Sequence, residues 1–358
     1  MDNESCIRFS KQYVCLKSKK NPEWIENFIS KIDEKDNKLN IVLPMLVAIK
    51  ETWEVVNKFP KSIQNHYWIN TPHNYLGKNI DELSYFVSNL LEHNKINKAI
   101  YELYFNIEIC NTEFIGNILT SISTKNNQMD FDDTYIIELL EYLNNHSYDK
   151  DKLIKLELYF SNCFSHERPK SDLCIHKEFI HSPEIFCEIV EKRFDIIYSY
   201  YYPYLNILEC WKLLPGTNDD KTIDKNYLYN WRDKCCELLS SEDLEYVNIK
   251  LGNLLGQFEK NKNNWPCEEV CEIIEELNNE YMNMGFKRGL YHARFSSSTK
   301  HKNATIERNI AKDYEKFCDE YHDIFPKTVK LVHELKNQIL HEAKRHEKDL
   351  KLRNFKYK

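Results

Sequence analysis

The stretch that decides the fold is W-P-C-E-E-V-C-E-I-I-E-E-L-N-N-E-Y-M-N-M, residues 265–284. Pro266 followed by Glu268 and Glu269 predicts a helix start, because proline suits the first turn and acidic side chains favour its positive end. Six residues then recur at helical spacing and predict one buried stripe: Val270, Ile273, Ile274, Leu277, Tyr281 and Met284. The stretch therefore predicts an amphipathic helix that needs neighbours to cover its apolar face.

Stripes of the same spacing recur from Asn21 to Leu352, whereas the strict alternation typical of strands is almost absent. Ser182-Pro183-Glu184 is a second clear helix start, because the serine hydroxyl can cap the first turn. Ile80–His93 and Ile96–Cys110 lie on either side of a short polar break and predict a helical hairpin. The pattern is that of a chain of amphipathic helices.

The sequence also predicts the secondary structure of several further segments. The sequence predicts a helix over about Leu39–Phe59, and two final helices over about Asn303–Phe325 and Pro326–Leu352. Arg8–Leu16 and Ile197–Tyr202 are rich in β-branched or aromatic residues, so strands are the alternative there.

The fold class expected from these patterns is all-α, with helical hairpins stacked as an irregular α-solenoid. Only 7 Gly and 10 Pro occur in 358 residues, which favours long helices over short strands and tight turns. Two stacked helical bundles are the alternative, but no helix is apolar all round, as the centre of one large globule requires. We expect an N-terminal helical-repeat segment over 1–205 that continues into a C-terminal helical segment over 206–358.

Composition narrows the class of protein. The net charge of −7 and the pI near 6.0 disfavour a chain built wholly around nucleic-acid phosphates. No apolar run reaches the roughly 18 residues of a membrane span, and the first ten residues lack an apolar signal core. A soluble, cytoplasmic protein without membrane contact is therefore expected. The 12 cysteines include no C-x-x-C pair, so we expect reduced thiols, no metal site and no cofactor.

Several blocks of sequence suggest a family. They include W-K-L-L-P-G-T-N-D-D from Trp211, N-W-P-C-E-E-V-C-E-I-I-E-E-L from Asn264, G-F-K-R-G-L-Y-H-A-R from Gly285, and earlier segments over 66–100, 151–160 and 176–190. Together they span roughly 64–351 and resemble the C-terminal helical region, of HEAT or TPR type, of large bacterial proteins associated with anti-phage or genome-defence loci. The resemblance implies a helical module and carries over no catalytic residue. Relatives have an Arg-Gly pair and a glycine-rich acidic turn where this chain has Arg294-Phe295 and S-S-S-T-K-H-K-N-A-T.

Arg294 and His301 are separated by six residues, a spacing that small helical ribonucleases use. In such enzymes the arginine binds phosphate and the histidine acts as acid or base. The residues between them are typical of a loop, so a solvated loop is the competing interpretation.

Cysteines and histidines also gather around Arg168, and they are candidates for a thiol nucleophile or a metal site: Cys163, His166, Cys174 and His176. Cys174 and His176 are two residues apart, and side chains at that spacing point to different faces of a helix. The spacing therefore favours a buried cysteine beside an exposed histidine.

Two segments are candidate interaction surfaces. An aromatic cluster that combines contact area with hydrogen-bonding tips predicts a protein-binding surface or the wet edge of a core: Tyr200, Tyr201, Tyr202 and Tyr204. The end of the chain is basic, with ten Lys/Arg against four Asp/Glu from Lys327 onward. Its candidate phosphate contacts are Lys344, Arg345, Lys348, Lys351 and Arg353.

The last helix is expected to divide into two parts. Val329, Val332, Leu335 and Ile339 recur at helical spacing and predict docking on the preceding helix, whereas charged residues dominate beyond Ala343 and predict projection. Earlier in the chain, G-N-L-L-G-Q at residues 252–257 lacks the features of a phosphate loop and predicts a place where two helices approach closely.

The leading functional hypothesis is a non-enzymatic helical-repeat scaffold or sensor that binds a protein partner in a defence-type system. A small helical ribonuclease or toxin using Arg294 and His301 is the second hypothesis. The third is nucleic-acid binding through the basic C-terminal helix.

Overall fold

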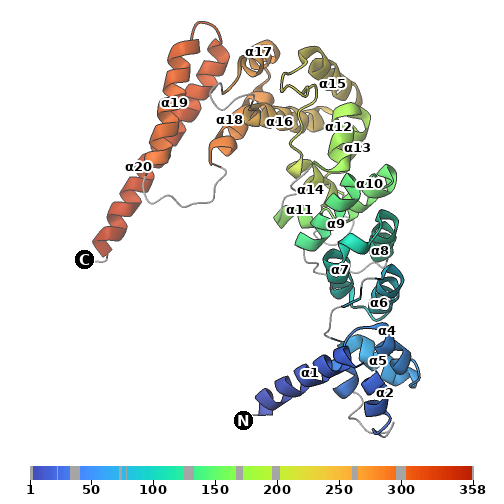
Figure 1. Cartoon of the computed structure of the whole chain (residues 1–358). Helices are drawn as coiled ribbons and strands as arrows, with labels where there is room; N and C mark the ends of the chain where they lie inside the picture. The colour runs from blue at the N-terminus through green and yellow to red at the C-terminus, as the bar shows by residue number, and fades with distance from the viewer. Residues whose placement is uncertain are drawn as a thin grey trace. The chain divides into compact units, whose positions relative to one another are not determined.

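The computed structural model describes residues 3–21, 23–32, 41–71, 75–77, 79–124, 133–166, 172–195, 202–259, 265–295 and 304–356. This part of the chain is all-α (Figure 1). No strand occurs in it, and isolated bridges join Ala48 to Tyr75 and Thr217 to Ile223. Within the same ranges, no helix combines the length and the apolar character needed to cross a membrane.

The chain divides into two compact units, Met1–Cys174 and Ile175–Lys358, whereas the sequence suggested a division near residue 205. The first unit contains α1 (Asn3–Lys20), α2 (Glu23–Ile29), η1 (Leu43–Met45), α4 (Lys50–Val56), α5 (Lys61–Asn70), α6 (Ile80–Glu92), α7 (Ile96–Phe105), η2 (Ile107–Ile109), α8 (Thr112–Thr124), α9 (Asp133–Asn145), α10 (Lys150–Tyr159) and α11 (Cys163–His166).

The predicted hairpin is confirmed as α6 and α7. The Asn79 side chain accepts a hydrogen bond from the Asp81 N–H at 2.8 Å and so caps the start of α6. Phe86 and Leu90 on α6 and Leu103 on α7 are fully buried, each contributing roughly 1.5–3 kcal/mol by leaving water. Helix α7 also packs on α9, and α8, α9 and α10 pack on one another, so the apolar faces of these helices are covered by neighbours that are close in the chain.

Two buried glutamates hold the backbone of neighbouring segments in this unit. Glu102 on α7 is fully buried and accepts hydrogen bonds from the Tyr75 N–H at 3.0 Å and the Lys98 ammonium at 3.1 Å. Glu157 on α10 is fully buried and accepts from the Cys174 N–H at 2.8 Å. A buried carboxylate must be paired in this way, because an unpaired one costs several kcal/mol.

The helix expected over residues 39–59 is wrong as a single element. Pro44 lies in the short η1, the backbone is extended at Leu46 and Ile49, and α4 begins only at Lys50. Proline supplies no N–H to a preceding carbonyl, and so favours the end of a helix over its continuation. Residues 8–16, where strand was the alternative, are helical in α1, and residues 197–201 lie outside the described ranges.

The second unit contains α12 (Cys174–His181, which begins at the unit boundary), α13 (Pro183–Glu191), α14 (Pro203–Cys210), α15 (Lys225–Leu238), α16 (Ser241–Gln257), α17 (Glu268–Leu277), α18 (Glu280–Phe295), α19 (Thr305–Tyr321) and α20 (Pro326–Lys356). The predicted start at Ser182 is confirmed, since its hydroxyl accepts from the Ile185 N–H.

The closest helix contact of this unit joins α16 to α18 through glycines. A Cβ atom on Gly252 would lie 2.0 Å from the Met282 carbonyl oxygen, and one on Gly285 would lie 1.9 Å from that of Ile249. Gly256 and Gly289, one turn along each helix, are nearly as tight, with shortest Cβ contacts of 2.4 and 2.2 Å. The close approach predicted at residues 252–257 is confirmed, and α18 supplies a matching pair of glycines.

The stripe predicted over residues 270–284 is correct in its first half only. Val270, Ile273 and Ile274 are buried, but α17 ends at Leu277 and Met284 is 53% exposed. Asn278 adopts the left-handed conformation with φ 41°, which asparagine tolerates better than most residues. The Asn279 side chain then accepts from the Met282 N–H at 3.0 Å and starts α18 in a new direction.

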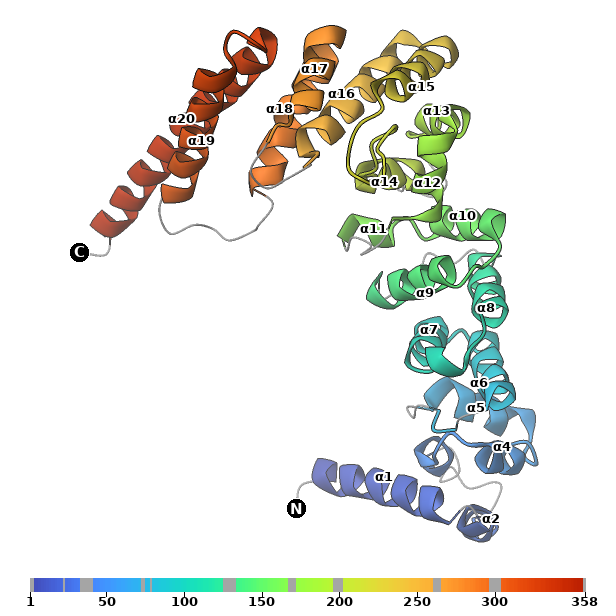
Figure 2. The same ribbon diagram turned by 45° about the horizontal axis from the view of Figure 1, so that its top comes forward.

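Helices α19 and α20 lie side by side in both views (Figures 1 and 2). The docking predicted for the first half of α20 is confirmed, because Val332, Leu335 and Ile339 are buried. Docking continues beyond Ala343, which is also buried, since Glu347 bonds to Arg308 of α19 at 2.8 Å. His346 likewise pairs with Glu307 at 3.1 Å.

The glycine contact gives a first test. Gly285→Ala should lower the free energy of unfolding of the second unit by about 3 kcal/mol or more, because the new methyl group meets rigid backbone. Urea unfolding followed by circular dichroism measures the change.

Met284→Ala is the matched control, because it changes the residue next to Gly285 on the same helix at a position that is 53% exposed. A change within about 1 kcal/mol is expected. Equal losses in the two variants would contradict the account of the α16–α18 contact.

Candidate functional site

Arg294 lies at the end of α18 in a structural contact. Its guanidinium carbon is 4.6 Å from the centre of the Trp265 ring, and its Nη1 is 3.9 Å from a carboxylate oxygen of Asp313 on α19. Trp265 in turn stacks on Tyr314 with ring centroids 5.8 Å apart. The side chain therefore links α18 to α19 and Trp265, while His301 lies outside the described residues.

The expectation of an exposed histidine at position 176 is wrong. His176 is 3% exposed, whereas Cys174 is half-buried. The His176 Nε2 donates to the Ile207 carbonyl of α14 at 2.9 Å, and the Cys210 sulfur lies 3.7 Å from the same nitrogen. The error has a physical reason, since helix spacing separates the faces of residues 174 and 176 but does not show which face meets α14.

Cys210 and His176 do not form a catalytic pair. The Nε2 atom nearest the thiol carries the proton that it donates to Ile207, so it cannot accept a proton from sulfur. Burial lowers the pKa of His176 to about 3, which keeps the ring neutral. The described residues contain no group of three His, Cys, Asp or Glu side chains that could hold a metal ion.

The predicted tyrosine surface is described only in part. Tyr202 and Tyr204 flank the buried Pro203 at the start of α14 and are both half-buried, while residues 200 and 201 lie outside the described ranges. In the predicted basic patch, Lys344, Arg345 and Lys348 are exposed on α20. Residues 351 and 353 belong to the same helix.

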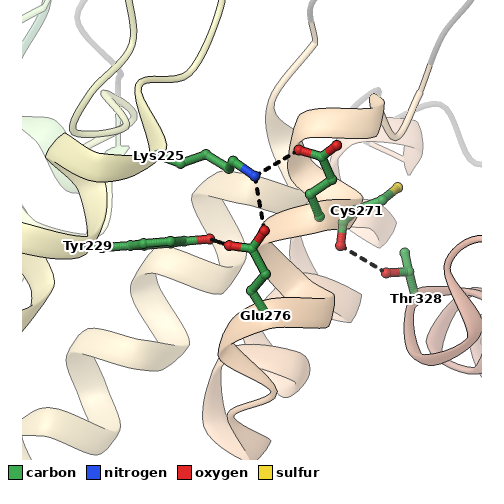
Figure 3. Close-up of polar contacts among 6 residues, drawn as sticks. Lys225, Tyr229, Cys271, Glu276 and Thr328 are labelled. Atoms are coloured by element: carbon green, nitrogen blue, oxygen red, sulfur yellow. Dashed lines mark hydrogen bonds and ion pairs between the residues drawn. The ribbon is translucent and has the colours of Figure 1, made fainter.

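A polar network joins α15 to α17 (Figure 3). The Lys225 ammonium of α15 lies 2.9 Å from Glu272 and 3.0 Å from Glu276, and the Tyr229 hydroxyl donates to Glu276 at 2.5 Å. The Tyr229 and Lys225 hydrogen bonds hold the pKa of Glu276 below its usual range. On the other side of α17, the Thr328 hydroxyl of α20 donates to the Cys271 carbonyl at 3.5 Å. These contacts fix the helices to one another and use their donors internally.

The strongest candidate for a binding surface lies in the first unit, on α7 and α9. Tyr101, Tyr104 and Phe105 of α7 meet Tyr135 of α9, with ring centroids 4.2–5.9 Å apart. We call these four residues the aromatic patch. Phe105 is 57% exposed and the three tyrosines are half-buried. Packed rings with one large exposed member are typical of a preformed contact surface.

Sequence reasoning missed the aromatic patch, although part of the signal was present. The buried apolar residues of α7 are Ile96, Ala99, Ile100 and Leu103, so Tyr101 and Phe105 fall beside the apolar stripe. Aromatic residues outside a stripe indicate a surface that is not only core. Their meeting with Tyr135, some thirty residues later, depends on the packing of α7 on α9 and is not readable from spacing.

Comparison with models of known protein families, with curated proteins and with solved structures gives no match for this chain.

His176 gives a pH test with a defined sign. The unfolded chain takes up a proton at the ordinary histidine pKa of about 6.5, whereas the folded protein does so only near pH 3. Between these values the unfolded state binds more protons, so stability must fall as pH is lowered.

We expect the free energy of unfolding of the wild type to fall by about 2 kcal/mol more between pH 6.5 and pH 5 than that of His176→Gln. Glutamine is chosen because its amide can still donate to the Ile207 carbonyl. Urea unfolding at a series of pH values measures both slopes, and parallel slopes would show that His176 titrates normally in the folded protein.

Proposed function

We propose that the chain is a non-enzymatic helical-repeat module, an irregular α-solenoid that acts as a scaffold or sensor by binding a protein partner in a bacterial defence-type system. The support is the succession of amphipathic helices, several of which pack on a near neighbour in the chain, together with the sequence resemblance to the helical regions of defence proteins. Neither the fold nor the resemblance identifies the partner, so the proposal needs a surface on this chain that a partner could bind.

The aromatic patch is the observation that carries it. Phe105 leaves more than half of its side chain in water, and covering that area would contribute about 1–2 kcal/mol to binding. The four rings hold one another in place, so a partner orders little when it binds. A rigid aromatic anchor of this kind is typical of the centre of a protein interface.

The surroundings of the patch favour a protein over a nucleic acid. Tyr104 and Tyr135 lie at an interplanar angle of 32° with centroids 4.8 Å apart, so these faces are already covered and less open to a base. Glu108, three residues after Phe105, is exposed and would repel phosphates. The Lys98 ammonium, 5.9 Å from the centre of the Tyr101 ring, is already bonded to Glu102. An apolar side chain of a protein partner fits both features.

The contacts of Arg294 support a structural role for this residue, because its guanidinium packs on Trp265 and lies beside Asp313. A phosphate-binding arginine has to present its guanidinium to a substrate. These contacts therefore favour a non-enzymatic protein over a ribonuclease.

A photoreactive phenylalanine analogue placed at position 105 tests the proposal. In extract of the source cells it should give one discrete crosslinked protein, because the partner covers this ring. Excess wild-type chain should compete for that product, whereas excess Phe105→Ser chain should compete about 5- to 30-fold less well, as expected for an anchor worth about 1–2 kcal/mol.

The matched control is the same analogue at Ile324, which is 62% exposed and lies in the second unit. It should give no discrete product. The same crosslinked protein at both positions, or none at position 105, would overturn the aromatic patch as the binding surface.

A further inference from the structure

The outward face of α20 carries a row of basic and polar side chains. The residues follow a spacing of three or four, so they share one side of the helix, and all are exposed: Lys330, His333, Asn337, His341, Lys344 and Lys348. We call this row the α20 stripe. It runs for about 27 Å, since each residue advances the helix by about 1.5 Å.

The three acidic residues of α20 whose side chains the structure describes have partners on other helices. Glu334 bonds to Lys287 of α18 at 2.9 Å, Glu342 accepts from the Tyr291 hydroxyl at 3.2 Å, and Glu347 bonds to Arg308 at 2.8 Å. The Lys287 hydrogen bond holds the pKa of Glu334 below its usual range, so this carboxylate stays charged and paired. Two of the three carboxylates are thus neutralised by a cation of a neighbouring helix, and the third is held by a hydroxyl.

The lysines of the stripe form no hydrogen bond to a carboxylate within the described residues, although Lys330 and His333 add to the positive field that lowers the pKa of Glu334. Within the described part of the chain, Lys330, Lys344 and Lys348 form no ion pair with a carboxylate. Lys336, which faces α19, shows the contrast, because it bonds to Glu315 at 3.2 Å. The pairing of charges is therefore one-sided, and it leaves positive charge on the side that faces solvent.

We infer that the α20 stripe binds the phosphate backbone of a nucleic-acid duplex, a binding site that is additional to the protein-binding function proposed for the first unit. Three cations and three hydrogen-bond donors along one side of a helix can contact successive phosphates of a backbone. The stripe contains no aromatic or large apolar anchor of the kind that centres a protein interface. Binding through its lysines is to backbone charge and does not depend on base sequence.

A lipid surface fits less well. An amphipathic helix enters a membrane interface through a free apolar face. On α20 that face consists of Val332, Leu335, Ile339 and Ala343, which are buried in the second unit. Only the charged side of the helix remains outside.

The test uses the full chain and a fluorescent duplex of about 20 base pairs, with binding followed by anisotropy. Three lysine–phosphate contacts predict that affinity falls about 40-fold between about 50 and 200 mM salt, and Lys344→Gln/Lys348→Gln should reduce this fall to about 4-fold. Circular dichroism should be unchanged, because both side chains are exposed.

The matched control removes the same charge from the same helix pair. Lys312→Gln/Lys316→Gln changes two exposed lysines of α19 and should bind the duplex like the wild type. Equal losses in the two double variants would show a general charge effect and overturn the site.

Two other probes distinguish the class of partner. Poly-glutamate that displaces the duplex at equal charge concentration would assign the stripe to acidic proteins. Anionic phospholipid vesicles that bind the wild type but not Lys344→Gln/Lys348→Gln, with no duplex binding, would assign it to lipid. Either result overturns the inference. Phe105→Ser should bind the duplex like the wild type, so a failure of this inference can be told apart from a failure of the protein-binding proposal.

Discussion

The contact between the glycines of α16 and α18 is the constraint on which the second unit depends. Where Gly252 faces Met282 and Gly285 faces Ile249, only a hydrogen atom fits between the two backbones. A shift of α18 by one residue along its partner would bring a side chain into this space, so the helix has one register. That register sets the position of Arg294 on Trp265 and of the side chains that bond α18 to α20. The positions of α19 and α20 relative to α18 depend on this register.

In the first unit, buried carboxylates and packed aromatic rings hold the helices in position. Glu102 and Glu157 each accept a backbone N–H from a segment outside their own helix, which ties irregular backbone to the helical core. The arrangement is specific because a buried carboxylate left without its partner costs far more than the hydrogen bond contributes. Glu102 lies in α7 between Tyr101 and Leu103, so the helix that presents the aromatic patch is anchored from its buried side. Anchoring of this kind keeps the exposed ring in a fixed orientation.

The parts of the fold that sequence predicts are those that depend on neighbours along the chain. The α6–α7 hairpin, the cap at Ser182 and the buried first half of the stripe at Val270 all follow from local spacing and capping chemistry. The turn at Asn278 was missed because the apolar spacing continues across it, although two successive asparagines are a signal for a helix end. The burial of His176 and the aromatic patch could not be predicted, because each depends on which helices meet. Gly285 and Gly289 become meaningful only once α16 is known to be their partner.

The one-sided pairing of charges on α20 has a kinetic consequence. A chain with net charge −7 repels a negatively charged molecule at long range, but the α20 stripe, whose lysines form no ion pair within the described residues, presents a local field of the opposite sign. Such a field acts before contact, by turning the approaching molecule toward one side of the protein. It changes the rate of productive encounters more than the lifetime of the complex, and it weakens steeply once dissolved ions shorten the range of the field. The outer face of α20 would then control how fast the protein finds a charged partner.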